Sequence, residues 1–471
     1  MIPDNGRRFT WPPAWAAPAL HDIRRDLALW RGDMTREPDY PKDAVHVPIP
    51  ADIATASADL LFAEPPVVKA ITGDDTATHM QAVIDQIVNT SDMLPVLAEA
   101  GEIASATGGV YLRVGWDVSI TDRPVAQVVD PDAAIPTFSL GVLREVTFWT
   151  DITDGDDTYR LLEDHRPGVI EYALFKGSDM LGQRLPLDSI PETAHLAAVV
   201  DAESTVQTGT SRLTALYIPN MRPAKRWRRT PMAAFGRSDY DDVRHLFTQA
   251  DTVMGSWMRD IRLARARIVV PSDYLTPLGG GRGARFDITD EVFTGLPGMT
   301  LEESGGPIVR QFDIRVTEHQ DTLHALTDII LRRAGLSQST FGEQEGVETA
   351  TGVKAKQQLS TRTRAKKLIY WRAALIELAR VLTDVSATVY GTAPVPTDVR
   401  LDAGFPVETQ VDADEAARTA QAMLTAQAAS TATRVRLLHP DWSSERVNDE
   451  VAAIHVEFGT GPAGSPDLTR L

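Results

Sequence analysis

The amino-acid sequence predicts an α+β fold in which long helices accompany a region of antiparallel strands. Apolar residues between 350 and 390 recur at the 3,4 spacing of a packed helix, whereas residues 108–218 alternate apolar and polar positions between Gly and Asp turns. The chain has 471 residues, 43% of them hydrophobic, which is typical of a folded protein with several cores. We therefore expect two to four domains.

The first 107 residues are predicted to be mostly helical after an irregular arm. Residues 1–48 are rich in Trp and Pro, and the stretch "VPIPADIATASADLLFAEPPVV" has one apolar helical face that Pro65 and Pro66 bring to an end. A second helix is expected from about 75 to 106. Its apolar stripe consists of Met80, Val83, Ile84, Ile87 and Val88.

Two further helices are expected to flank a small module. The first begins near Ser238, which with Asp241 resembles a capping signal, and continues to about 265. The segment 266–315 is dense in Gly and Pro and predicts a separate module with short strands, and a helix follows from about 317 to 334. At the C-terminus we expect an Ala-rich helix and a second helix with Asp441 and Ser443 as candidate caps.

The stretch 350–390 predicts one helix of ~60 Å at the usual rise per residue. Its second half contains the spaced apolar residues, and its first half is basic and lacks acids. A helix of this length exceeds the needs of one domain core, so we interpret it as part of an assembly. The apolar series is Leu368, Trp371, Leu375, Leu378, Leu382, Val385 and Val389.

The charge balance limits the role of nucleic acid. The formal net charge is -18, and phosphate affinity comes mainly from Lys and Arg, so a tight non-specific DNA clamp is disfavoured. Two basic segments stand out: the first half of the long helix, and "MRPAKRWRR" from 221 to 229. Either could grip phosphate, but we favour pairing with acids of the same chain or of a neighbouring subunit.

The sequence contains no recognisable motif for catalysis or for binding a cofactor. Cys is absent, and neither a Walker motif, a G-x-S-x-G motif nor an HExxH motif occurs. We therefore predict no catalytic residues, no metal site, no cofactor and no enzymatic activity. No run of about 18 apolar residues indicates a membrane span.

The order of these elements resembles the portal proteins of tailed bacteriophages, of the Gp6-like type and similar to those of actinobacterial phages. The similarity covers nearly the whole chain, and its most specific parts are "GRSDYDDV" before the first long helix and "TGVK" at 351–354. The ending "LLHPDWSSERVNDEVAAIHVEF" is similar to the ends of portal proteins of actinobacterial phages. The family usually has Ser where Thr351 stands here. The resemblance implies a portal-type fold with these parts: wing 1–236, stem helix 237–265, clip 266–315, stem helix 316–336, tunnel loop 337–350, wing helix and linker 351–407, helical crown and tail 408–471.

The same resemblance implies a homo-oligomeric ring, expected to be a dodecamer, at one vertex of the capsid of the virion. Double-stranded DNA would pass through it non-specifically during packaging and ejection. The implied partners are the large terminase subunit, a head-tail adaptor, and the major capsid and scaffold proteins, with assembly in the host cytoplasm and no membrane contact.

The resemblance also places the candidate DNA-contacting residues. The loop 337–350 would face the channel, and its acids would let a duplex slide because like charges repel. The expected channel-lining residues are Gln338, Glu343, Gln344, Glu345 and Glu348. The candidate contacts to DNA or to neighbouring subunits are Lys354, Lys356, Arg362, Arg364, Lys366 and Lys367.

Two alternatives stay open at the level of sequence. A DNA-processing enzyme would use the basic helix as a clamp and acids to bind Mg²⁺, but it requires clustered acids at strand ends, which the sequence does not show. A head-tail adaptor or other structural connector without a channel would ordinarily be much shorter than 471 residues.

Overall fold

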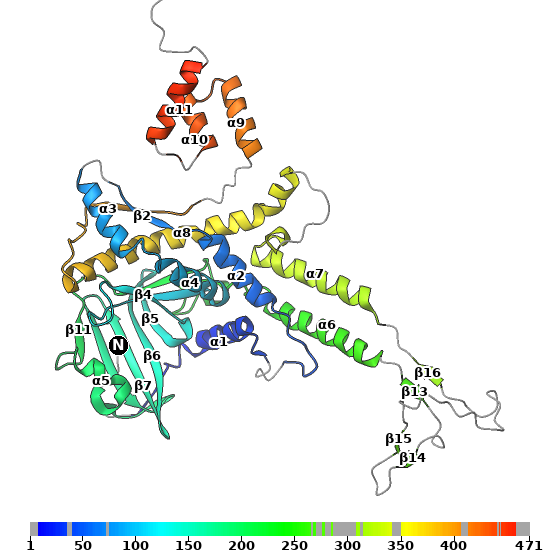
Figure 1. Ribbon diagram of the computed structural model, residues 1–471. Helices are drawn as coiled ribbons and strands as arrows, with labels where there is room; N and C mark the ends of the chain where they lie inside the picture. Colours follow the sequence, from blue (N-terminus) through cyan, green and yellow to red (C-terminus); the bar gives the residue numbers. More distant parts are fainter. Residues whose placement is uncertain are drawn as a thin grey trace, which may run out of the picture. The chain divides into compact units, whose positions relative to one another are not determined.

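The computed structural model describes residues 8–34, 40–71, 75–264, 314–341, 350–406, 413–439, 442 and 444–457, and four short strands between 267 and 310. The chain divides into two compact units, Met1–Phe405 and Pro406–Leu471. Figure 1 shows that the first unit combines helices with antiparallel sheets, as the sequence predicts.

Two antiparallel sheets form the β-rich part of the first unit, which confirms the prediction for residues 108–218. The larger has the order β10-β8-β7-β6-β5, with β11 also paired to β8, and the smaller has the order β12-β3-β4. The strands of the larger sheet are β5 (Ala134–Ser139), β6 (Val142–Asp154), β7 (Asp157–Arg166), β8 (Val169–Lys176), β10 (Arg184–Leu185) and β11 (Thr205–Gln207). Those of the smaller are β3 (Gly109–Gly115), β4 (Val125–Val129) and β12 (Ala215–Pro219). Two further pairs are β1 (Phe9–Thr10) with β9 (Met180–Leu181), and β2 (Val67–Ile71) with β17 (Arg400–Gly404).

The single helix expected from 75 to 106 is in fact two, α3 (Asp75–Ile87) and α4 (Met93–Thr107). Pro95 explains the break, because it has no N–H and its ring would clash with the carbonyl of residue 91 in a continuous helix. The other helices of this region are α1 (Ala17–Arg31), α2 (Ile49–Phe62) and α5 (Pro191–Ala197).

Side chains of α3 and of the turn after it cover the outer edge of β2. The Asn89 amide accepts from the Val68 N–H and donates to the Val68 carbonyl, both at 2.9 Å. The Gln81 amide accepts from the Ala70 N–H at 2.9 Å and donates to the same Val68 carbonyl at 3.0 Å. Three backbone groups on this edge, the Val68 N–H and carbonyl and the Ala70 N–H, are thus paired with side chains.

The long helix is confirmed as α8 (Ala350–Val389), which crosses the first unit in Figure 1. Its apolar series packs inside the chain's own core, where the ring of Phe62 meets that of Trp371 edge-on at 4.8 Å. The packing that this spacing predicts is therefore within the chain: the seam is buried against α2, α3, α4 and the smaller sheet.

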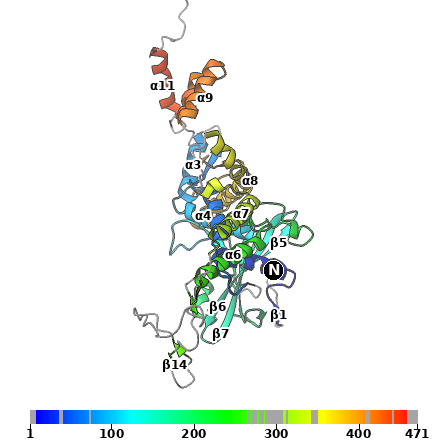
Figure 2. The same cartoon turned by 90° about the vertical axis from the view of Figure 1, so that its right-hand side faces the viewer.

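Two antiparallel helices, α6 (Arg244–Leu263) and α7 (Val316–Ala334), leave the body side by side (Figures 1 and 2). Helix α6 begins at Arg244 and not near Ser238. The Ser238 hydroxyl donates to the Ala106 carbonyl and accepts from the Tyr240 N–H, so it holds a buried turn against α4 instead of capping a helix.

Between these helices, β13 (Arg267–Val269) pairs with β16 (Ile308–Arg310), and β14 (Thr276–Pro277) pairs with β15 (Ala284–Arg285). Among the described residues of the second unit there are three helices where two were expected: α9 (Ala413–Thr425), α10 (Thr431–Leu438) and α11 (Ser444–Glu457). The predicted caps Asp441 and Ser443 lie outside the described residues. Among the helices that are described, none has the length and apolar character to cross a membrane.

Candidate ring interface and channel elements

The pair α6 and α7, which we call the stem, is joined to the body by a shared apolar cluster. Phe247 and Ala250 of α6 and Ile330 and Leu331 of α7 are buried there together with Ile53 of α2. Other large apolar side chains of the stem and its approach are exposed to solvent, three of them at the outer end and Ile329 beside the buried cluster. They are Ile261 (42%), Ile314 (38%), Val316 (44%) and Ile329 (43%).

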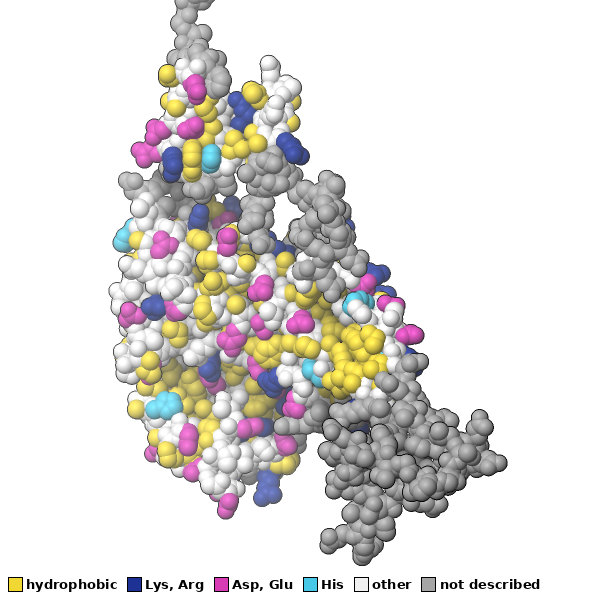
Figure 3. Space-filling view, turned by 45° about the vertical axis from the view of Figure 1, so that its right-hand side comes forward, with side chains coloured by type: hydrophobic (Ala, Val, Ile, Leu, Met, Phe, Trp, Pro, Cys, Tyr) yellow, Lys and Arg dark blue, Asp and Glu magenta, His cyan; other side chains and the backbone are white. Residues whose placement is uncertain are grey.

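Hydrophobic side chains gather over the stem helices on the face shown in Figure 3. Contiguous apolar surface on a folded protein is a sign of a contact surface. Within the part of the chain that the structure describes, the exposed apolar side chains of α6 and α7 provide a surface that a second copy could bury.

The segment before α2 is fastened across the stem by Asp251 of α6. Its carboxylate accepts from the Val47 N–H at 2.8 Å and from the Tyr40 hydroxyl at 3.0 Å. Burial and this neighbouring carboxylate raise the pKa of Tyr40. Gly255 makes the close approach possible, because a Cβ there would lie 2.0 Å from the Asp43 carbonyl oxygen.

The outer end of the stem is held by a charged clamp between the two helices. The Arg315 guanidinium donates to the Asp260 carboxylate at 3.0 and 3.2 Å, and His319 Nε2 lies 3.0 Å from Asp260 Oδ2. The indole of Trp257 stacks on the His319 ring. The hydrogen bonds from His319 and Arg315 lower the pKa of the Asp260 carboxyl.

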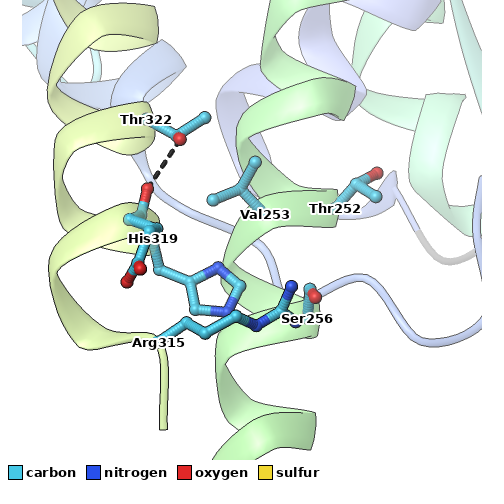
Figure 4. Close-up of a pocket in the computed structure, with 7 residues that line it drawn as sticks. Thr252, Val253, Ser256, Arg315, His319 and Thr322 are labelled. Carbon is cyan, nitrogen blue, oxygen red and sulfur yellow. Dashed lines mark hydrogen bonds between the residues drawn. The ribbon is translucent and has the colours of Figure 1, made fainter.

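A cavity of about 360 Å³ lies beside this clamp (Figure 4). Within it, the Thr322 hydroxyl donates to the Glu318 carbonyl, so this donor is used by the helix itself. The cavity is lined by Thr252, Val253, Ser256, Arg315, Glu318, His319 and Thr322. Among the described residues, no group of His, Asp or Glu side chains is arranged to hold a metal ion.

The beginning of the predicted tunnel loop is tied to α8 by three hydroxyl groups. Helix α7 is followed by Gly335 in the left-handed conformation (φ 86°), and the chain continues into the 3-10 turn η6 (Gln338–Phe341). The Ser360 hydroxyl of α8 lies 2.8 Å from that of Ser337 and 2.9 Å from that of Thr340. Gln338 is exposed beside this contact. The other expected channel-lining residues, Glu343, Gln344, Glu345 and Glu348, lie outside the described residues.

The basic half of α8 is divided between surface and interior. Arg362 and Lys366 are exposed, whereas Arg364 is half-buried and its Nε donates to the Leu60 carbonyl. For Lys354 and Lys356 the helix is described but the side chains are not.

Lys367 is buried inside the chain, so we remove it from the candidate contacts to DNA or to other subunits. Its Nζ donates to Asp239 Oδ2 and to the Ser57 hydroxyl, each at 2.5 Å. Asp239 also accepts from the Ser105 hydroxyl at 2.6 Å and from the Asn220 amide at 2.8 Å. Burial lowers the pKa of Lys367, and the Asp239 carboxylate opposes that shift.

The sequence does contain a signal for this buried lysine. The buried residues Ser360, Thr363, Lys367 and Trp371 follow one another at helical spacing, in line with the apolar seam. The network joins α8 to α2, to α4 and to the turn that leads into α6.

The second basic segment, 221–229, is partly neutralised by acids of the same chain. Lys225 pairs with Asp242 at 3.1 Å, and Arg226 pairs with Asp22 at 2.8 Å. Intramolecular pairing is thus confirmed for these two residues.

Comparison with known proteins identifies the family. The family model of phage portal proteins, SPP1 Gp6-like, matches residues 17–454, while no curated protein matches the sequence significantly. The chain is similar in structure to a chain from the neck of an empty gene transfer agent particle solved with C6 symmetry (13% identity, TM-score 0.46, 93% of this chain and 96% of that chain). It is also similar to a chain from the virion of a native gene transfer agent particle (11% identity, TM-score 0.42, 92% and 96%). Because the family match spans most of the sequence, this chain belongs to the Gp6-like phage portal proteins.

Proposed function

We propose that this portal protein forms a closed ring, expected to be a dodecamer, at the capsid vertex, and that double-stranded DNA passes through it during packaging and ejection. The exposed apolar side chains of the stem carry the proposal, because a ring places the stem of each copy against the next and buries them. The net charge of -18 fits a conduit that DNA does not adhere to.

Assembly is tested by substituting the stem. We expect the wild-type chain to form one large species in native mass spectrometry, and Val316→Asp with Ile329→Asp to remain monomeric with an unchanged circular dichroism spectrum. The buried charge would face the neighbouring stem without a partner. Val118→Asp, at an exposed apolar site of the β3–β4 loop, is the matched control and should assemble normally. A wild-type chain that stays monomeric or dimeric at all salt concentrations, also with scaffold present, would contradict the ring.

The loop 337–350 is proposed to line the narrowest part of the channel. Its support is the sequence, which has three Glu and no Lys or Arg in this range, together with the hydroxyl contacts that fix its first residues on α8. The alternative is that the segment is an ordinary surface loop between two helices, with no role in the channel.

Changing Glu343, Glu345 and Glu348 together to Lys should slow DNA translocation, most strongly at low salt where charges are least screened. Many positive charges would then surround a polyanion. The measurement is the packaging rate of assembled particles over a range of salt concentrations. Changing the exposed Asp154, Asp156 and Glu203 to Lys is the matched control, because these acids belong to the β-rich region. Equal rates for wild type and loop variant at every salt concentration would remove the loop from the constriction.

We further propose that the segment 266–315 is the clip that meets the large terminase subunit and later the head-tail adaptor. Its support is its position in the sequence between the two stem helices, where a loop-rich module can be presented to partners. The β-rich region and α8 correspond to the wing, and contacts with the major capsid and scaffold proteins are assigned to it. The second unit corresponds to the crown, and assembly takes place in the host cytoplasm.

A further inference from the structure

A second cavity, of about 220 Å³, lies where η6 folds against α7 and α8. It is far larger than the ~15 Å³ that one water molecule requires. Its lining has two chemical characters. Leu331, Leu336 and Leu359 form apolar wall, and Asp328, Gln338 and Ser339 supply polar groups.

Two atoms of this lining are buried without a hydrogen-bond partner: Asp328 Oδ1 and Ser339 Oγ. Buried polar atoms are normally paired, and an ionised carboxylate can only accept. The group that completes the cavity must therefore donate hydrogen bonds, and a positive charge on it would offset the buried carboxylate.

We propose that this cavity, the loop-base pocket, receives the side chain of an Arg or Lys from a second copy of the chain. The apolar wall suits the methylene stem of such a side chain, and Asp328 with Ser339 suits its charged end. The negative charge of the Asp328 carboxylate would repel a DNA phosphate, so a phosphate is not expected in this pocket. The proposal rests on the proposed ring, because Asp328 lies next to Ile329, one of the exposed apolar residues that a neighbouring stem would bury.

A cation of the same chain stands near the pocket and has to be distinguished from this donor. Arg332 lines the pocket one helical turn after Asp328, and its side chain is exposed. Among the ion pairs of the described residues, none joins Arg332 to Asp328, although the i,i+4 spacing would allow it. Arg332 thus competes with an incoming cation and does not satisfy the carboxylate.

The test uses the full-length protein and follows ring dissociation on dilution by mass photometry. Asp328→Asn keeps the size of the side chain and removes its charge, and we expect its rings to dissociate at a protein concentration at least tenfold higher than wild type. Asp321→Asn, an exposed acid on the same helix, is the matched control and should leave dissociation unchanged. Thermal unfolding of dilute monomer should be unaltered or raised in Asp328→Asn, which separates an effect on assembly from an effect on folding.

Arg332→Gln should leave the rings as stable as wild type or more so, because a competing charge is removed. If Arg332→Gln weakens the rings as much as Asp328→Asn, the partner is Arg332 and the proposal is overturned. Rings of Asp328→Asn that match wild type overturn it as well, and so does a cryo-EM map of the ring with only water in the pocket. In each of these three cases the proposed ring itself is unaffected. A wild-type chain that never assembles overturns both the ring and this pocket assignment.

Discussion

Replacing Lys367 with Met is expected to lower the free energy of unfolding by about 3–5 kcal/mol, the range found when one partner of a buried ion pair is removed. Met fills a similar volume, so the loss arises from charge and hydrogen bonding. Asp239 would keep its bonds from Ser105 and Asn220 but would lose the cation that balances its buried carboxylate. Chemical denaturation of the monomer measures the change.

The adjacent lysine provides a matched control. Lys366 is exposed on the same helix, and Lys366→Met should change stability by less than about 0.5 kcal/mol. Adding Asp239→Asn to Lys367→Met should recover part of the loss, because the unpaired charge is removed. Equal stability of the Lys367 and Lys366 variants would show that the buried pair does not form.

Gly255→Ala is expected to destabilise the protein by about 2 kcal/mol, within the usual range for overpacking. In an exposed helix the same change is favourable by about 1 kcal/mol, so the predicted sign is reversed. The new methyl group would displace the backbone at Asp43, and the hydrogen bond from the Val47 N–H to Asp251 would be strained with it.

Hydrogen exchange locates this effect. The amides of Val45 and Val47, which donate to the backbone and side chain of Asp251, should exchange faster in Gly255→Ala than in wild type. Thr252→Ala, at an exposed position of the same helix, should leave both amides protected. A Gly255→Ala protein more stable than wild type would mean that the segment does not pack on α6.

The sequence was sufficient for elements whose apolar residues repeat regularly. The seam of α8 and the strands of residues 108–218 are examples, because burial of one face imposes the spacing. Pro95 also indicates the break between α3 and α4, but the apolar stripe from Met80 to Val88 favoured the prediction of one continuous helix.

Tertiary contacts explain what pattern alone did not show. Ser238 is a residue type that often caps helices, yet its hydroxyl donates to a carbonyl of α4, and α6 begins only at Arg244. Lysine is usually exposed, yet Lys367 is buried because it pairs with Asp239, which is distant in sequence. The exposed stem surface and the loop-base pocket arise where side chains are not covered by other parts of the fold. The spacing of residues in the sequence cannot predict which side chains these are.

The amide coverage of β2 has a consequence for the time before a ring closes. At high local concentration, the unpaired edge of a strand in one subunit can pair with a strand of another subunit. Repeated pairing of this kind leads to fibrils. At β2 the Val68 N–H and carbonyl and the Ala70 N–H are already bonded to the side chains of Gln81 and Asn89. A strand of a second chain could pair with β2 only after four hydrogen bonds were broken. These side-chain bonds therefore oppose aggregation of the free subunit through this edge.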